Sequence, residues 1–296
     1  MTASRPDPMQ LTKLHATGND FLVHLAGDRP DPVVAGPVAA AVCHRHTGVG
    51  ADGLIVLSPG RDGADATMTL FNADGGVAEM SGNGIRCLAW VARREGLGTR
   101  ERLVVDTGGG RRSLDLELDA AGDVVAATCD MGPVTFEPDA IPVDAPSATG
   151  LTAEVHGVQY EGDAAGMGNP HLVLLVDDPA EARVTQHGPR LERDPRFPHR
   201  TNVEFVAPVA GKPDTITMRV WERGVGETLS CGTGACAAAA VAHRRGLVGD
   251  RVTVHVPGGV LTVGLWDTVT LGGPVAHVFD VALDVGTLLP ASEGVR

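Results

Sequence analysis

Short apolar runs bounded by turn residues recur along the whole chain and predict strands. The clearest runs are Asp20–Leu25, Leu54–Leu57, Thr67–Phe71, His171–Val176, Val203–Val206 and Thr217–Trp221. Runs of four to eight mostly aliphatic residues, flanked by Gly, Asn, Asp or Ser, are typical of strands. The pattern therefore predicts several strands in each half of the chain.

Two longer apolar segments, each after a glycine-rich turn, predict helices. Ile85–Arg94 and Ala235–Arg245 are apolar on nearly every side, which is typical of a buried helix. Each ends on two adjacent arginines and is followed by Gly96 or Gly246, as expected at a helix C-terminus. We therefore expect one central helix in each half.

Three other segments complete the pattern. The polar stretch 184–200 predicts a surface helix and loop, and Ala276–Asp284 predicts a strand that could close either sheet. The polar, proline-punctuated start Met1–Gln10 predicts a loose tail rather than a signal peptide.

The chain repeats itself at an offset of 150 residues without a gap. Thr67–Phe71 aligns with Thr217–Trp221, and Ala51–Leu57 aligns with Thr201–Ala207. The same offset aligns three glycines before the first helix with three before the second, and Gly18-Asn19 with Gly168-Asn169. A register kept by separate blocks predicts a duplication: two similar domains related by a pseudo-twofold axis, with a site in the cleft between them.

Composition fits this picture and excludes several classes of protein. The 296 residues are enough for about two domains, and 43% hydrophobic with 21% charged residues is typical of a globular protein. A net charge of -13 argues against binding to nucleic acid or an anionic membrane. An odd number of cysteines, five, in no disulfide-like pattern predicts a cytoplasmic chain with reduced thiols. No apolar run approaches the length of a membrane helix.

The turns before the two helices are the strongest candidates for chemistry. They read Ser81–Gly84 (SGNG) and Cys231–Gly234 (CGTG). Glycines let a ligand approach the backbone, and the free amides of a first helical turn attract a carboxylate or phosphate. One such turn alone is more simply a helix cap, but two in register favour a ligand site.

Cys231 stands where a helix N-terminus lowers the pKa of a thiol, so we expect a partly ionised base or nucleophile there. The remaining cysteines are expected to be inert structural thiols. They are Cys43, Cys87, Cys129 and Cys236.

Two other motifs resemble ligand sites, but their surroundings in the sequence argue against that function. Gly48–Gly53 matches G-x-G-x-x-G, but a strand follows it instead of preceding it, so a dinucleotide site is not expected. Cys43–His46 (CHRH) has no second ligand pair at zinc-like spacing. With no P-loop, Schiff-base lysine motif or Ser-His-Asp signature either, we expect no metal and no cofactor.

Six blocks of the sequence resemble the diaminopimelate epimerase family. The blocks are Lys13–Val23, Arg45–Leu54, Phe71–Cys87, Gly168–His171, Thr201–Phe205 and Trp221–Ala237. The resemblance runs from about Leu11 to Asp284, and the last block is the most specific. It implies an isomerase of bacterial lysine and peptidoglycan precursor biosynthesis that interconverts LL- and meso-diaminopimelate without pyridoxal or any other cofactor.

The resemblance also implies an α+β fold in which each domain wraps a mixed or antiparallel sheet around a central helix. We expect an N-terminal half at 1–129, joined by a C-terminal strand at 278–296, and a C-terminal half at 130–277. The expected partner is the small-molecule substrate, with no nucleic acid and no membrane, and the expected assembly is a homodimer.

Site residues follow from the resemblance position by position. Cys231 is the proton acceptor, Ser81 occupies the position of the second acid–base residue, and His171 and Glu222 support them. The residues implied to bind the α-carboxylate are Gly82, Asn83, Gly232 and Thr233. The residues implied to bind the other polar groups of the substrate are Asn19, Asn72, Asn169, Asn202, Glu222 and Arg223.

Position 81 departs from the family pattern. The family carries cysteine there, and inverting a stereocentre needs an acid on one face and a base on the other, whereas a serine hydroxyl is a poor proton donor at neutral pH. Three interpretations stay open: a natural variant that still epimerises through Ser81, a deliberate cysteine-to-serine change, or one-base chemistry such as exchange or elimination. Another racemase, dehydratase or isomerase of the same fold and an inactive binding protein are further alternatives.

Overall fold

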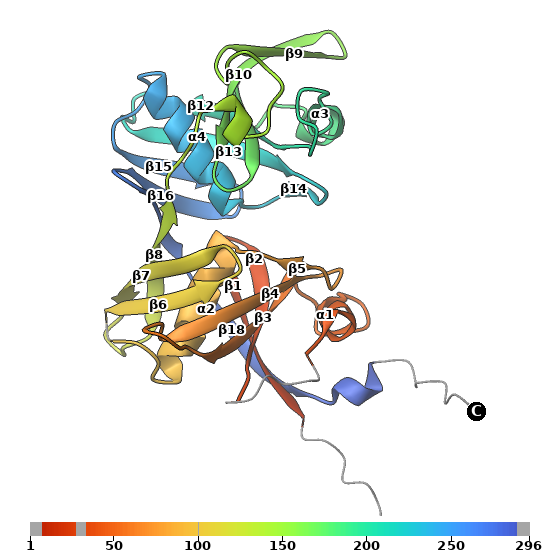
Figure 1. The fold of residues 1–296 in the computed structure, drawn as a ribbon, viewed down its shortest axis with the longest axis vertical. Helices are drawn as coiled ribbons and strands as arrows, with labels where there is room; N and C mark the ends of the chain where they lie inside the picture. Colours follow the sequence, from red (N-terminus) through yellow and green to blue (C-terminus); the bar gives the residue numbers. More distant parts are fainter. Residues whose placement is uncertain (1–7, 28–33, 100, 289–296) are drawn as a thin grey trace, which may run out of the picture. The chain divides into compact units, whose positions relative to one another are not determined.

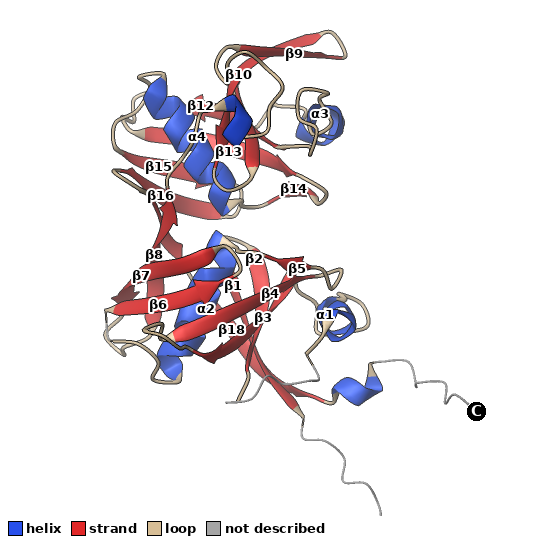
Figure 2. Ribbon diagram, viewed as in Figure 1, coloured by secondary structure: helices blue, strands red, loops and turns tan. Residues whose placement is uncertain are grey.

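The computed structural model describes residues 8–27, 34–99 and 101–288. Its contacts divide the chain into two compact units. Unit 1 takes the residues up to Ala16, Asp20–Ala127 and those from Val275 on, while unit 2 takes Thr17–Asn19 and Thr128–Pro274. Figures 1 and 2 show that each unit consists mainly of strands with few helices.

Unit 1 surrounds helix α2 with strands (Figure 1). Its elements are β1 (Met9–Ala16), β2 (Asn19–Leu25), α1 (Gly36–Cys43), β3 (Gly53–Pro59), β4 (Ala66–Asn72), β5 (Val77–Ala78), α2 (Gly82–Arg94), β6 (Arg102–Thr107), β7 (Gly110–Leu118), β18 (Ala276–Leu283) and the short 3-10 helix η2 (Val285–Thr287). Strand β8 (Val124–Gly132) begins in unit 1 and continues into unit 2. Strands β2 and β3 are parallel, β4 runs antiparallel to β3, and β6 runs parallel to β4. The sheet is therefore mixed.

Unit 2 repeats this plan around helix α4. Its elements are η1 (Pro138–Ala140), β9 (Leu151–Val155), β10 (Val158–Gly166), β11 (Pro170–Leu175), α3 (Val184–Leu191), β12 (Asn202–Pro208), β13 (Thr215–Glu222), β14 (Gly226–Thr228), α4 (Gly232–Arg244), β15 (Arg251–Val256), β16 (Gly259–Leu265) and β17 (Val269–Pro274). Strands β11 and β12 are parallel, β13 runs antiparallel to β12, and β15 runs parallel to β13. This order of directions matches β2, β3, β4 and β6, so the repeat found in the sequence extends to the strand pairing.

The two central helices fill their sheets differently. In α2 the fully buried residues include Ile85, Leu88 and Arg86, whereas α4 buries a run of alanines, Ala235–Ala239, around Cys236. The strongly apolar positions explain why both helices lie inside their sheets. Both begin at the first glycine of the preceding turn, three residues before the predicted starts, so the glycine turns are the first helical turns themselves.

The two ends of the chain differ from expectation. Met9 and Gln10, assigned to a loose tail, belong to β1, because they pair with Leu283 and Ala282 of β18; residues 1–7 lie outside the described residues. The strand expected at 278–296 ends at Leu283, where the chain turns into η2, and residues 289–296 lie outside the described part. Pairing with β1 decides that this last strand closes the sheet of unit 1.

Segment 184–200 is less superficial than its polar sequence indicates. Helix α3 buries Val184, His187, Gly188 and Leu191. A Cβ added to Gly188 would lie only 2.5 Å from Cγ of Trp221, so the helix packs directly on that indole ring. The predicted helix is present, but half of it contributes to the core of unit 2.

Candidate active site

Ser81 and Cys231 are the N-cap residues of α2 and α4 and have nearly the same conformation. Their φ and ψ angles are −136° and 124° for Ser81 and −119° and 116° for Cys231. The Ser81 Oγ accepts a hydrogen bond from the Gly84 amide at 3.0 Å, and the Cys231 Sγ accepts one from the Gly234 amide at 3.4 Å. The two residues are therefore structurally equivalent within their units, as the sequence repeat predicts.

Cys231 is enclosed by protein, with only 6% of its surface exposed. Burial raises the pKa of the thiol well above its usual value, and the nearby carboxylates of Glu222 and Glu204 raise it further. Hydrogen bonds from Thr233 and from the Gly234 amide lower the pKa but do not outweigh burial. The pKa of Cys231 is therefore raised, not lowered as the helix N-terminus alone predicts, because burial and the two carboxylates outweigh the hydrogen bonds.

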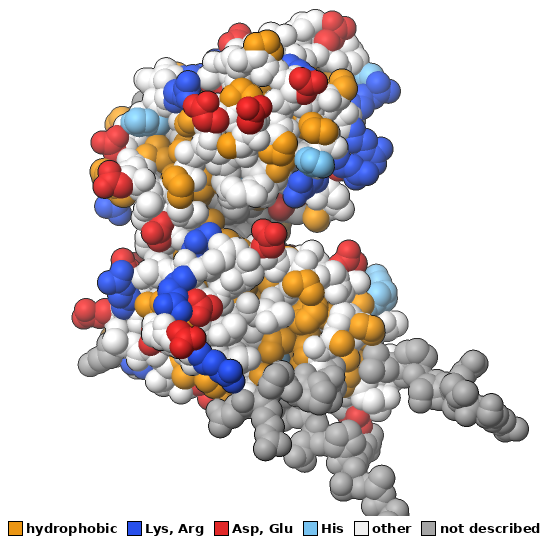
Figure 3. Space-filling view, viewed as in Figure 1, with side chains coloured by type: hydrophobic (Ala, Val, Ile, Leu, Met, Phe, Trp, Pro, Cys, Tyr) orange, Lys and Arg blue, Asp and Glu red, His pale blue; other side chains and the backbone are white. Residues whose placement is uncertain are grey.

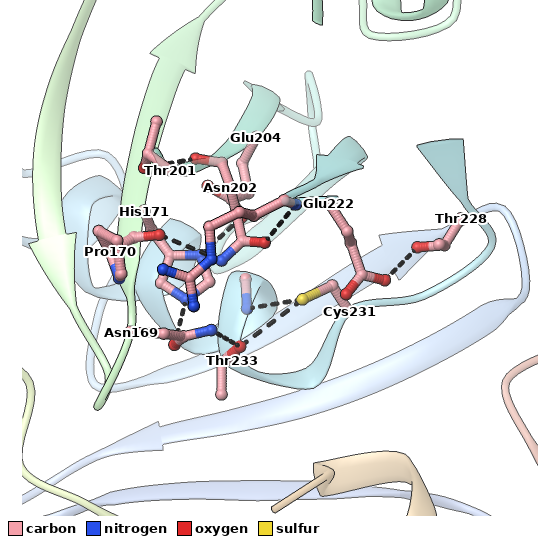
Figure 4. A network of polar contacts seen from close by, with 12 residues as sticks. Asn169, Pro170, His171, Thr201, Asn202, Glu204, Glu222, Thr228, Cys231 and Thr233 are labelled. Atoms are coloured by element: carbon pink, nitrogen blue, oxygen red, sulfur yellow. Dashed lines mark hydrogen bonds and ion pairs between the residues drawn. The ribbon is translucent and has the colours of Figure 1, made fainter. Parts of the chain in front are cut away.

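Glu222 lies at the end of β13 and shares the surroundings of Cys231. Its carboxylate accepts a hydrogen bond from the hydroxyl of Thr228, on the neighbouring strand β14 (Figure 4). Burial raises the pKa of Glu222, against hydrogen bonds from Thr228 and Cys231 that lower it. A thiol and a carboxyl group in contact, both with raised pKa values, can exchange a proton.

A row of polar side chains leads from the interior of unit 2 to Cys231 (Figure 4). His171 Nδ1 is 2.7 Å from Glu204 Oε1, and His171 Nε2 is 2.9 Å from Asn169 Oδ1. The Asn169 amide nitrogen then donates to Thr233 Oγ1 at 3.4 Å, and this oxygen is 3.6 Å from Cys231 Sγ. The fold thus brings together four of the predicted residues, Asn169, His171, Cys231 and Thr233, and adds Glu204 to them.

Asn202 and Arg223 meet at the other side of the same network. The Asn202 side chain donates to the Pro170 carbonyl at 3.1 Å and accepts from the Arg223 backbone amide at 2.9 Å. The Arg223 guanidinium donates to the His199 carbonyl at 3.2 Å and is largely exposed. In this arrangement Asn202 holds the turn after Glu222 in place.

The predicted residues of unit 1 gather at the start of α2, apart from Asn72. Gly82 and Asn83 are buried in the first turn, where the fully buried Arg86 donates to the Gly82 carbonyl at 2.9 Å and to Asn83 Oδ1 at 2.7 Å. Asn72 is exposed at the end of β4. The Asn83 side chain is therefore fixed by a cation from its own helix.

A cluster of charged side chains fixes the chain next to Asn19. Asp20 forms ion pairs with Lys13 and Arg45, both at 2.7 Å, and Arg45 also reaches Asp52 at 2.7 Å. Burial alone would raise the pKa of Asp20, but the hydrogen bonds from Arg45 and Lys13 outweigh it and lower the pKa to about 2. The cluster ties the middle of β1 and the start of β2 to the loop before β3.

Sequence reasoning missed Glu204 as a contributor to the site and did not single out the charged cluster around Asp20. Glu204 carried one usable signal: it is the single charge within the otherwise apolar run Val203–Val206. It is 0% exposed, and a buried carboxylate in a strand calls for a partner. The cluster gave no local signal because its members come from separate segments.

The remaining cysteines are buried, as expected of structural thiols. All five cysteines are free and buried, and burial raises the pKa of Cys43 and of Cys87 to about 12.

Within the described ranges, no group of His, Cys, Asp and Glu side chains could hold a metal ion. No helix among those residues is long and apolar enough to cross a membrane. In the view of Figure 3, acidic and basic side chains are interspersed on both units.

Solved structures with the same fold come from epimerases and related proteins. A hydroxyproline epimerase from Agrobacterium vitis matches with a TM-score of 0.70 at 20% identity, covering 96% of this chain and 94% of that one. A PhzF-family phenazine biosynthesis protein from Bacillus anthracis also matches with a TM-score of 0.70, at 14% identity, covering 94% and 99%. These likenesses define the fold as that of this group of proteins.

Sequence comparison narrows the group to one family. The family model for diaminopimelate epimerase matches residues 11–137 and 164–274. The diaminopimelate epimerase of Desulfitobacterium hafniense is 41% identical over 278 residues, which is 92% of this chain and 96% of the relative. That of Thioalkalivibrio sulfidiphilus is 41% identical over 285 residues, 94% and 99% of the two chains. The chain belongs to the diaminopimelate epimerase family, which confirms the predicted family, the α+β fold class and the isomerase class.

Proposed function

We propose that the chain interconverts LL- and meso-diaminopimelate by moving one α-proton, and that Cys231 takes this proton from the LL isomer. The observation that carries the proposal is the pair of equivalent N-caps, with a thiol beside a carboxylate at position 231. The family of the chain supports diaminopimelate as the substrate.

The raised pKa of Cys231 suits a base that must remove a weakly acidic proton. A thiolate whose conjugate acid has a high pKa is a stronger base than an ordinary thiolate, although it forms less readily. Glu222 is the group in contact that can receive the thiol proton first. The free amides at the start of α4 stabilise negative charge on the substrate carboxylate as the α-carbanion forms.

Ser81 occupies the N-cap from which the other repeat would return a proton. We propose that its hydroxyl relays a proton, directly or through a water molecule, at a lower rate than a thiol would. The contrasting interpretations are a cysteine deliberately changed to serine and one-base chemistry without inversion. A relay through Ser81 inverts the configuration of the α-carbon, whereas one-base chemistry leaves it unchanged.

Incubation with each stereoisomer in D2O, followed by mass and chiral analysis, tests the proposal. Inversion with deuterium incorporation is expected, with Ser81→Cys faster by at least about tenfold because a thiol is the better acid. Cys231→Ser should abolish exchange from the LL isomer. Deuterium entering the LL isomer without inversion would identify one-base chemistry, and no exchange from either isomer in folded protein would refute catalysis.

We further propose a cytoplasmic homodimer. Five free cysteines support a reducing compartment, and the adjacent apolar side chains of Val278 and Phe279, 49% and 40% exposed, are available on β18 for contact with a second copy. Sedimentation equilibrium should give twice the chain mass, and the double change Val278→Lys with Phe279→Lys should give the monomer. A parent chain that sediments as a monomer would contradict the dimer.

A further inference from the structure

The two repeats differ sharply beneath their helix N-termini. In unit 2, His171 and Glu204 are both 0% exposed and form a hydrogen-bonded pair. At an offset of 150 residues, unit 1 has Phe21 and Leu54, which are 4% and 0% exposed. The same fold therefore packs well with apolar side chains at these two positions, so the architecture does not require the pair.

The His171–Glu204 pair is not explained by stability. Moving a carboxylate and an imidazole out of water costs free energy that their mutual attraction only partly repays, and apolar replacements are often equally stable. Glu204 Oε2 has no hydrogen-bond partner among the residues that the structure describes. A buried pair that costs free energy and occurs in only one of two similar units indicates a role specific to unit 2.

A chain of side-chain contacts leads from the His171–Glu204 pair to Cys231. Glu204 Oε1 and Asn169 Oδ1 both accept hydrogen bonds, so His171 donates from Nδ1 to Glu204 and from Nε2 to Asn169, and the two acceptors fix the orientation of the ring. Asn169 in turn contacts Thr233, whose hydroxyl faces the sulfur. The first turn of α4 leaves room for the carboxylate, since a Cβ on Gly234 would lie 2.7 Å from Glu204 Oε1.

We propose that Glu204 is a positioning residue for proton transfer at Cys231, acting through the ring of His171 on Asn169 and Thr233. The inference rests on the proposed function, in which Asn169 and Thr233 bind the substrate and Cys231 takes its α-proton. Glu204 fixes the direction in which each of these groups donates or accepts, and it touches neither the substrate nor the sulfur itself.

Two variants and a matched control test this role. Glu204→Leu removes the acceptor, and Glu204→Gln keeps an oxygen for the Nδ1 proton but removes the charge. Asp163→Asn is the control, because Asp163 is an equally buried carboxylate that pairs with Arg245 at the opposite end of α4. Urea unfolding of each variant establishes that it is folded before the measurements.

The first readout needs no activity. In the parent and in Asp163→Asn, proton NMR should show a strongly downfield Nδ1 proton of His171, assigned by its loss in His171→Asn, because the hydrogen bond to Glu204 is short. Glu204→Leu should lose it, and Glu204→Gln should move it upfield. A resonance that persists unshifted in Glu204→Leu would overturn the proposal.

The second readout is the rate of deuterium exchange into LL-diaminopimelate. Glu204→Leu should lower the rate constant by about 10- to 100-fold with KM changed less than about threefold, since small displacements of positioned groups cost this much. Glu204→Gln should retain most of the rate, and Asp163→Asn should stay within about twofold of the parent. Equal losses in Glu204→Leu and Asp163→Asn, or an unchanged rate in Glu204→Leu, would refute positioning. A parent without any exchange would instead refute the proposed function, while the NMR signal would still decide the arrangement of His171.

Discussion

Gly234 and Gly84 offer a direct measure of how tightly Glu204 is held under α4. They are the third residues of their helices, at equivalent positions of the repeat. A Cβ on Gly234 would lie 2.7 Å from Glu204 Oε1, whereas a Cβ on Gly84 would meet only the flexible side-chain ends of Ile55 and Met68, at 3.1 and 3.3 Å, and Cβ of Ser81 at 3.2 Å. The same substitution thus has different consequences in the two units.

The expected magnitudes follow from this contrast. Alanine in place of glycine in a helix stabilises by up to about 1 kcal/mol, and Gly84→Ala should keep most of that gain because methyl ends can shift by a few tenths of an ångström. Gly234→Ala must displace a buried carboxylate from its bond with His171, and a hydrogen bond to a charged group contributes about 1.5–3 kcal/mol. We therefore expect Gly234→Ala to be less stable than Gly84→Ala by about 2 kcal/mol.

Calorimetry and urea unfolding of the two variants beside the parent measure the difference. For chains of this size, 2 kcal/mol corresponds to roughly 4–8 °C in Tm. The NMR signal of the His171 Nδ1 proton should change in Gly234→Ala and stay unchanged in Gly84→Ala. Equal stabilities, or a Gly234→Ala variant more stable than the parent, would refute the close approach of Glu204 to the helix.

Three further predictions follow from the charges and caps of the site. Glu222→Gln should speed alkylation of Cys231 by iodoacetamide at pH 8, since removing a neighbouring negative charge lowers the thiol pKa; mass-mapped rates slower than those of the parent would contradict this. The folded pKa of Asp20, about 2, lies below the unfolded value, so its stabilisation is present above pH 4 and disappears as pH falls. The parent should therefore lose about 1–2 kcal/mol of stability between pH 4 and pH 2 that Asp20→Asn does not lose. Parallel curves of unfolding free energy against pH, from urea unfolding of the two proteins, would contradict this contribution of Asp20. Ser81→Ala should lower the free energy of unfolding by about 1 kcal/mol through loss of the hydrogen bond to the Gly84 amide, as measured by urea unfolding; an unchanged value would show that the cap contributes nothing.

Local and periodic features were accessible from the sequence. Apolar runs in the sequence predicted both central helices and the strands β2, β3, β4, β11, β12, β13 and β18, and the 150-residue repeat predicted the equivalence of Ser81 and Cys231. Helix α1 and the other strands were not predicted. The helix starts were misplaced because Gly82 and Gly232 are poor helix formers in isolation, and tertiary packing overrides that preference.

Long-range features were not accessible in the same way. The sign of the Cys231 pKa shift depends on burial and on Glu222 and Glu204, which arrive from β13 and β12. A helix N-terminus alone predicts the opposite sign. The partners of Asp20 likewise come from segments up to 32 residues away, so only the folded chain shows which charges meet.

The pairing of β18 with β1 makes the order of synthesis matter for folding. Strand β1 ends at Ala16, and its antiparallel neighbour begins only at Ala276, roughly 260 residues later. At a synthesis rate of about 5–20 residues per second, that stretch takes roughly 13–50 s. During this time β1 lacks its partner, and an unpaired edge invites pairing with other chains. The first unit begun at the ribosome is therefore the last to be completed, and its early exposure to chaperones or neighbouring chains is set by the length of the second unit.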